Sequence, residues 1–185
     1  MKTTLVGTIW QSTGNSLLKQ VGLAVLGTIL LAISAKVQVP FWPVPMTMQT
    51  FVVLVLGIAY GARLGLATGV LYMLEGIFGL PVFATGSGYL YVIGPTGGYL
   101  FGFILAMGII GWLAERRWDR SVPSIVGAML IGEAIIFSVG IAWLASLIGI
   151  DRALQAGLYP FIAAEVFKIV LAAATIPLIW RRLAK

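Results

Sequence analysis

The sequence predicts an all-α integral membrane protein, and three observations lead to this prediction. Of the 185 residues, 60% are hydrophobic and only 10% are charged, whereas an ordinary soluble domain carries roughly 25% charged residues. The mean hydropathy is +1.04, which is more apolar surface than a soluble domain of this size can bury. Apolar runs long enough to cross a bilayer also recur along the chain. The length favours one transmembrane domain covering residues 1–185.

Six segments are predicted to cross the membrane as helices, because a span needs about 20 mostly apolar residues and must satisfy its own backbone hydrogen bonds. In chain order they are Leu17–Val39, Met46–Tyr60, Leu64–Leu80, Gly97–Ala114, Ser124–Ile150 and Tyr159–Trp180. The first segment has an alternative interpretation as a signal peptide, since its apolar run ends in the small residues of AISA. Cleavage there would leave five spans.

The positive charges support six spans with both termini in the cytoplasm. With a cytoplasmic N-terminus, nine of the 12 Lys and Arg residues fall on the cytoplasmic side: Lys2, Lys19, Arg63, Arg116, Arg117, Arg120, Arg181, Arg182 and Lys185. The outer loops carry only Lys36 and Arg152, and Lys168 lies inside the last span. This asymmetry is the one that the positive-inside rule describes.

The composition argues against several classes of function. The chain has no cysteine and no histidine, which excludes thiolate chemistry and removes the commonest general base and metal ligand. The motifs GxSxG, HExxH and the P-loop are absent from the sequence. We therefore expect no catalytic residues, no metal and no cofactor. The net charge of +6 indicates contact with anionic lipid headgroups rather than with nucleic acid.

Two outer loops differ from the short, basic inner loops, and the second of them is predicted to fold back over the helices as a lid. The loop VQVPFWPVPMT, residues 37–47, contains three prolines that prevent a regular helix, and Phe41 and Trp42 give it an apolar surface. The second loop, residues 81–98, is rich in glycine and hydroxyl residues and carries no charge. Long structured loops of this kind are often functional. For Trp42 the alternative is membership of an interfacial aromatic belt.

Charged residues inside the predicted spans indicate a binding site. Glu165 and Lys168 are three residues apart and therefore share one helix face. A charge at that depth costs about 2.5–3.5 kcal/mol, so such residues usually face the bundle interior and serve a function. The alternative is that the two charges only neutralise each other. Glu133 and Glu75, in the fifth and third spans, either line the same cavity or pair with a group on another helix.

The chemistry of these residues limits the class of ligand. An ammonium group suits a carboxylate on the ligand, and a carboxylate group suits N–H donors. Aromatic and aliphatic surroundings suit an uncharged ring and a short chain. A small amphiphilic acid with an N–H-bearing ring meets these requirements, which do not by themselves select one compound.

Five stretches of the sequence resemble the BioY family, the biotin-binding S components of energy-coupling factor (ECF) transporters. They are PVPMTMQT (43–50), GLPVFATG (79–86), GPTGGYLFGF (94–103) and YPFIAAEVFKIVLAA (159–173), with WLAERR (112–117) as a fifth. The resemblance implies six helices in the cell (inner) membrane of a prokaryote, with a biotin pocket near the outer face beneath the 1–2 and 3–4 loops. It also implies a transmembrane T component and two ATPase subunits as partners, since this chain has no nucleotide motif.

The resemblance also suggests roles for individual residues. Lys168 would pair with the biotin carboxylate or with the ureido oxygen, and Glu165 would orient Lys168 or accept a ureido N–H. Glu133 stands where the family often has Asn, which makes it a candidate pocket residue. The remaining candidates are Tyr89, Tyr91, Gly97 and Gly98, which would close over the ligand; Phe41 and Trp42, in the other lid; and Gln49, which would tie that lid to the second helix.

A stripe of small residues in the first span is the candidate contact with the T component. Ala24, Thr28 and Ala32 are spaced four residues apart, and such a stripe allows two helices to approach closely. The alternative is packing within this bundle.

Three other functions compete with biotin uptake. The first is an S component for another small vitamin or carboxylated ring compound, the second is a membrane enzyme that uses carboxylate, lysine or tyrosine side chains, and the third is a purely structural subunit. The missing catalytic constellation disfavours the enzyme, and the buried charges disfavour the structural subunit because they are costly without a task.

Overall fold

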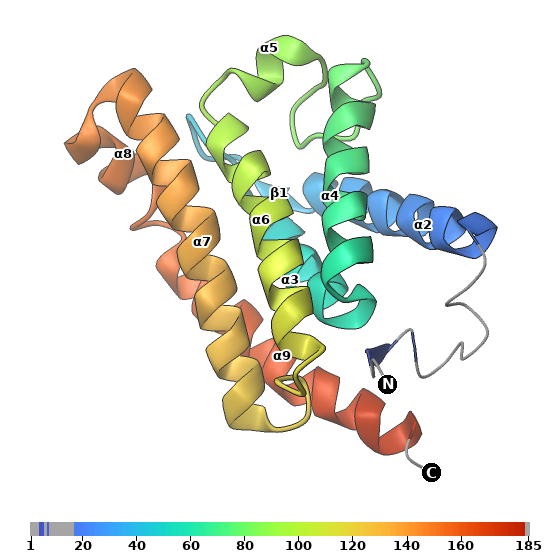
Figure 1. The fold of residues 1–185 in the computed structure, drawn as a ribbon. Coiled ribbons are helices and arrows are strands. Elements are labelled where there is room, and N and C mark those ends of the chain that lie inside the picture. Colours follow the sequence, from blue (N-terminus) through green and yellow to red (C-terminus); the bar gives the residue numbers. More distant parts are fainter. Residues whose placement is uncertain (1–3, 6, 8–16, 184–185) are drawn as a thin grey trace.

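The computed structural model describes residues 4, 5, 7 and 17–183, with residues 179–183 described by their backbone alone. The described helices are α2 (Leu17–Lys36), α3 (Gln49–Tyr60), α4 (Ala62–Ile77), α5 (Tyr89–Val92), α6 (Gly97–Ala114), α7 (Val122–Ile148), α8 (Ile150–Gly157) and α9 (Ile162–Leu183). A short antiparallel hairpin pairs β1 (Gln38–Val39) with β2 (Met46–Thr47). Figure 1 shows α6 running between α4 and α7, with α5 and α8 at one end of the bundle.

The chain is mostly helical, as predicted, and three helices are clear membrane spans. By length and composition α2, α6 and α7 can each cross a bilayer, and α8 with α9 forms a possible fourth span that is bent by 49°. The 12 residues of α3 and the 16 residues of α4 fall short of the roughly 20 residues that a straight span needs. The six predicted segments coincide with α2, α3, α4, α6, α7 and α9, but the count of six spans stays a prediction.

The short hairpin, α5 and α8 were not predicted from the sequence. Met46 and Thr47 form β2 instead of starting a helix, because the preceding prolines lack the N–H groups that a helix needs. The single turn of α5 lies inside the 3–4 loop. Gly149 has a φ of 84°, a conformation that favours glycine, and it separates α8 from α7. A turn at residues 158–161 follows α8, so the last long helix begins at Ile162 rather than at Tyr159.

Helix α6 forms the centre of the bundle and α2 lies at its edge. In α6, 67% of the residues are buried. In the most apolar 18-residue stretch of α7 the buried share is 44%, and in that of α2 it is 33%. The exposed face of α2 is apolar and includes Leu18, Val21, Leu26, Ile29 and Ile33. Because exposing this much apolar surface to water is unfavourable, the face is suited to lipid.

The small-residue stripe of α2 packs within the bundle. Ala24 is 7% exposed and Thr28 is 2% exposed, while Ala32 is partly buried against the core. The Thr28 hydroxyl donates a hydrogen bond to Glu75 Oε1 on α4 at 3.0 Å. The stripe therefore packs against this chain's own helices, as in the alternative interpretation, and its contact with a T component stays a prediction. Glu75 pairs with a hydroxyl group from α2.

Side chains from three elements hold the 3–4 loop against the bundle. The Tyr72 hydroxyl on α4 donates to the carbonyl of Val82 at 2.8 Å. The ammonium of Lys36, at the end of α2, donates to the carbonyl of Phe83, and Gln38 Nε2 in β1 donates to the carbonyl of Ala84 at 3.3 Å. Three consecutive loop carbonyls are thus satisfied by side chains rather than by water. This contact also gives Lys36, one of the two cations expected on the outer side, a structural task.

The buried ring of Phe83 anchors the 3–4 loop to the core. Its side chain is fully buried, stacks on Tyr91 with ring centroids 4.8 Å apart, and meets Tyr72 edge-on at 5.6 Å. The ring occupies the space that a side chain at Gly76 would need. The loop is therefore a packed part of the fold.

We predict that Gly76→Ala lowers stability, because the added methyl group would overlap the Phe83 ring. Overpacking of this kind typically costs about 1–3 kcal/mol. Gly22→Ala on α2 is the matched control, since no atom lies within 4 Å of its added methyl group. Thermal unfolding of the detergent-purified proteins should show a lower Tm for Gly76→Ala only, and equal Tm values would contradict this packing.

We predict that Lys36→Met loosens the 3–4 loop, because two of its carbonyls then lose an ammonium donor. A hydrogen bond to a charged group contributes about 1.5–3 kcal/mol, so amide exchange through local opening should speed up roughly tenfold or more. Hydrogen–deuterium exchange followed by mass spectrometry on a peptide covering residues 81–88 measures this. Arg63→Met, an exposed cation at the start of α4, is the control, and unchanged exchange in Lys36→Met would contradict the prediction.

Candidate ligand-binding site

Four residues from three elements form a buried polar cluster, which we call the Lys168 cluster: Thr47 of β2, Thr50 of α3, and Glu165 and Lys168 of α9. Lys168 Nζ lies 2.8 Å from Glu165 Oε1, and both side chains are buried. The same ammonium donates to Thr50 Oγ1 at 2.8 Å and to the Thr47 carbonyl at 2.7 Å. The ion pair that the spacing predicts is present, and residues far away in the sequence complete it.

The cluster is a closed ring of hydrogen bonds. An ammonium has three protons to donate, and Lys168 uses them on Thr47, Thr50 and Glu165. The Thr50 hydroxyl donates its own proton to Glu165 Oε2 at 2.8 Å. A ligand group that binds Lys168 must therefore replace one of these three bonds, whereas the Glu165 carboxylate keeps lone pairs for additional donors.

The helix ends explain why the carboxylate is located here. Glu165 lies in the first turn of α9, and its partner Thr50 lies in the first turn of α3. The positive ends of both helix dipoles favour a negative charge at this point. The i, i+3 spacing then puts Lys168 on the same face of α9, directed towards α3.

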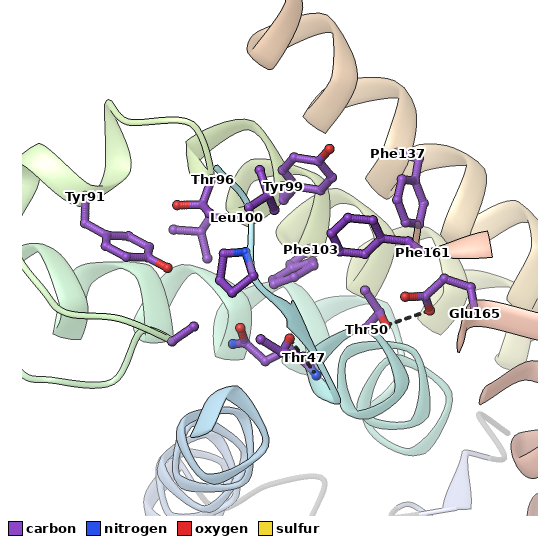
Figure 2. Close-up of a pocket in the computed structure, with 14 residues that line it drawn as sticks. Thr47, Thr50, Tyr91, Thr96, Tyr99, Leu100, Phe103, Phe137, Phe161 and Glu165 are labelled. Carbon is purple, nitrogen blue, oxygen red and sulfur yellow. Dashed lines mark hydrogen bonds between the residues drawn. The ribbon is translucent and has the colours of Figure 1, made fainter. Parts of the chain in front are cut away.

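Beside the cluster lies a small cavity, which we call the inner cavity. Its polar lining includes Thr47, Gln49, Thr50, Thr96 and Glu165, and its aromatic lining comprises Tyr91, Tyr99, Phe103, Phe137 and Phe161. Figure 2 shows Thr50 and Glu165 close to Phe137 and Phe161 on one side, with Tyr91 and Thr96 on the other. The cavity therefore combines a charged end with walls suited to an uncharged ring.

The inner cavity is closed down in this conformation. Its volume is about 40 Å³, room for roughly three water molecules at 10–15 Å³ each. Pockets for small-molecule ligands usually measure about 300–1,000 Å³. A ring compound can enter only if the covering loops or the aromatic side chains move.

The aromatic wall is a chain of edge contacts. The rings of Tyr99 and Phe137 lie 5.9 Å apart at 89°, and those of Phe137 and Phe161 lie 5.9 Å apart at 69°. The Tyr99 hydroxyl is anchored on the Gly157 carbonyl at 2.8 Å. These contacts connect α6, α7 and the turn before α9, so ring positions depend on all three segments.

Several residues predicted from the sequence meet at this site. Glu165, Gln49 and Tyr91 line the inner cavity, and Lys168 joins it through Thr47 and Thr50. Gln49 Nε2 donates to the Tyr72 hydroxyl at 2.7 Å, and Tyr72 in turn holds the 3–4 loop. The side chain of Gln49 therefore links the cavity to the 3–4 loop, rather than to the 1–2 lid as expected.

Glu133 lies near the cluster but outside the lining of the cavity. It is 7% exposed and interacts electrostatically with both Glu165 and Lys168. By distance and angle, neither of its carboxyl oxygens makes a hydrogen bond among the described residues, although the Glu165 carboxyl lies close enough to interact with it. A buried polar group without a partner costs free energy, so this side chain retains unused hydrogen-bonding capacity one turn before Phe137.

Other predicted residues lie elsewhere. Tyr89 is 63% exposed and lies outside the lining of the cavity. Gly97 and Gly98 are buried, and a side chain there would collide with the Val92 carbonyl and with Trp143, respectively. They allow α6 to approach α5 and α7 closely, whereas close approach to a ligand was expected. Phe41 and Trp42 lie in a separate groove outside the inner cavity.

Sequence reasoning missed Thr47, Thr50 and the aromatic wall. Thr47 and Thr50 belong to the motif PVPMTMQT, but Thr50 is 115 residues away from its partner Glu165. Nothing in a single sequence specifies that pairing. The rings of Tyr99, Phe137 and Phe161 lie in apolar runs, where the sequence does not distinguish a ring that lines a cavity from one that packs in the core.

Comparisons with known proteins identify the family and the fold. A model of the BioY family matches residues 3–185. The chain is 36% identical to the probable biotin transporter BioY of Pyrococcus horikoshii, over 89% of this chain and 96% of that protein. It is 38% identical to the biotin transporter BioY of Thermotoga maritima, over 79% and 86% of the two chains.

A solved structure is similar to the whole fold. The crystal structure of the S-component for biotin from an ECF-type ABC transporter superposes with a TM-score of 0.76 at 22% identity, covering 91% of this chain and 94% of that one. The two chains therefore share a fold. Together with the match along nearly the full length, these findings show that the chain belongs to the BioY family.

Proposed function

We propose that this chain is the biotin-binding S component of an ECF transporter, a membrane-embedded subunit that captures biotin outside the cell and delivers it inward. The observation that carries the proposal is the Lys168 cluster, buried beside a cavity with aromatic walls, in a chain of the BioY family. Relatives named as biotin transporters support the choice of ligand.

The chemistry of biotin fits the two parts of the site. Its ureido ring has two N–H donors for the Glu165 carboxylate and one carbonyl oxygen that can accept from Lys168 in place of an internal acceptor. Its fused rings are uncharged and suit the wall of Tyr99, Phe137 and Phe161. The unused carboxyl oxygens of Glu133 supply further hydrogen-bonding capacity once a ligand has separated the surrounding side chains.

We further propose six spans, cytoplasmic termini and a cavity that opens to the outside. Arg116, Arg117 and Arg120 follow the end of α6, which lies at the opposite end of the bundle from α5 (Figure 1), and the positive-inside rule assigns that end to the cytoplasm. The hairpin and the 3–4 loop then cover the cavity from outside, with Tyr91 in one lid and Phe41 and Trp42 in the other. Biotin enters when these lids move, since the closed cavity is too small for it.

The energy for transport comes from partners in this proposal. The chain has no P-loop, so ATP hydrolysis falls to two ATPase subunits coupled through the T component. The chain itself performs no chemical step, and its task is recognition. An S component for another small vitamin is the alternative, which binding assays with thiamine and riboflavin separate from biotin.

We predict that Lys168→Ala weakens biotin binding roughly ten- to hundredfold, because a hydrogen bond to a charged group contributes about 1.5–3 kcal/mol. Calorimetric titration of the purified protein with biotin measures this. The variant also leaves Glu165 as an uncompensated buried charge, which is strongly destabilising. The neutral pair Glu165→Gln with Lys168→Met removes this problem and should still bind weakly, so near-normal affinity in that folded double variant contradicts the site.

We predict that Thr50→Val weakens biotin binding about five- to tenfold while preserving side-chain volume, because the hydroxyl that joins Lys168 to Glu165 is lost. Thr175→Val is the matched control, since that hydroxyl bonds only to the backbone of its own helix, well beyond the cluster. The same titration compares the two variants. An equal effect of both substitutions would argue that Thr50 acts through general helix stability.

A further inference from the structure

A second hollow lies next to the inner cavity, and we call it the outer groove. Its volume is about 430 Å³, and it runs between the 1–2 loop, which contributes Phe41, Trp42 and Pro43, and the α8 region, which contributes Arg152, Gln155 and Pro160. The Phe41 ring lies 6.4 Å from the Phe161 ring, which lines the inner cavity. Phe41, Pro160 and Phe161 therefore form one wall that separates the two hollows.

Arg152 is the single charged residue among those that line the outer groove. It is exposed, and within the described part of the chain no salt bridge joins it to a carboxylate. Of the two cations that the charge distribution assigns to the outer side, Lys36 binds the loop carbonyls. Arg152 also lies on the outer side, against the positive-inside bias. Among the described residues, no contact like that of Lys36 explains its position.

The inner cavity is a poor place for an anion. The three protons of Lys168 are already used, and its charge is balanced by Glu165 at 2.8 Å. Glu133 lies within electrostatic range of both. A ligand carboxylate placed there would face the Glu165 carboxylate and an ammonium that Glu165 already neutralises, and like charges at close range repel each other. An uncharged N–H-bearing ring brings no such penalty.

We propose that the outer groove binds the carboxylate-bearing aliphatic chain of the ligand, with Arg152 as the partner of the carboxylate. This inference rests on the proposed function, in which the ring of biotin occupies the inner cavity. The chain then passes the wall of Phe41 and Phe161 and lies against Phe41 and Trp42, apolar surfaces suited to methylene groups. A guanidinium group binds a carboxylate through two parallel hydrogen bonds. Of the two partners predicted for Lys168, the proposal keeps the ureido oxygen and assigns the carboxylate to Arg152.

The test compares biotin with biotin methyl ester, which has the same ring and chain but no charge. The wild-type protein should bind the acid more tightly than the ester by roughly two- to fivefold, the range expected for an exposed ion pair. Arg152→Gln should abolish this preference by weakening the acid and leaving the ester unchanged. Arg152→Lys, which keeps the charge but loses the paired geometry, should retain part of it. Arg63→Gln, an exposed cation at the start of α4, is the control and should retain all of it.

Three outcomes would overturn the proposal. The acid preference could persist in Arg152→Gln, or acid and ester could weaken equally, which would assign Arg152 to packing. The third outcome is loss of bound anionic lipid from Arg152→Gln with an unchanged acid preference, which would assign the residue to a headgroup. Failure of the proposed function looks different, because then neither biotin nor its ester binds the wild-type protein.

Discussion

The buried ammonium of Lys168 is the constraint on which the rest of the site depends. An ion of this kind is tolerated inside an apolar bundle only when its charge and its protons are all satisfied. Meeting that requirement brings together the start of α9, the first turn of α3 and the carbonyl of Thr47 in the hairpin. The hairpin is thereby held over the cavity, and the proline-rich loop gains a fixed position that its composition alone would not specify.

The helical core and the buried pair could be predicted from the sequence, since both follow from local patterns. The boundaries of α6 agree with its apolar run at both ends, and the spacing of Glu165 and Lys168 was enough to predict a shared face. Long-range partners could not be predicted. The Thr50 hydroxyl, the Tyr72 bond to Val82 and the Thr28 bond to Glu75 each join segments that a single sequence does not relate.

Glycine was the least informative residue type in the sequence. A glycine permits close approach, but it does not specify what approaches. Gly98 was assigned to a ligand and instead accommodates Trp143, while Gly76, which was assigned no role, accommodates the Phe83 ring. In both cases the partner comes from a distant part of the chain, so the meaning of the glycine depends on tertiary packing.

The two sides of the inner cavity differ in how easily they can open. On one side the Lys168 cluster is buried, so breaking it would leave charges without partners at a cost of about 3–5 kcal/mol. On the other side Lys36 is exposed, and water can replace the loop carbonyls as its partners when the loop moves. The wall of Phe41 and Phe161 is held by apolar contact alone. Opening therefore costs least at this aromatic wall, because the 3–4 loop is also held by the buried Phe83 ring and by the Tyr72 hydroxyl. A ligand that enters at the wall meets the intact cluster at the bottom of the cavity.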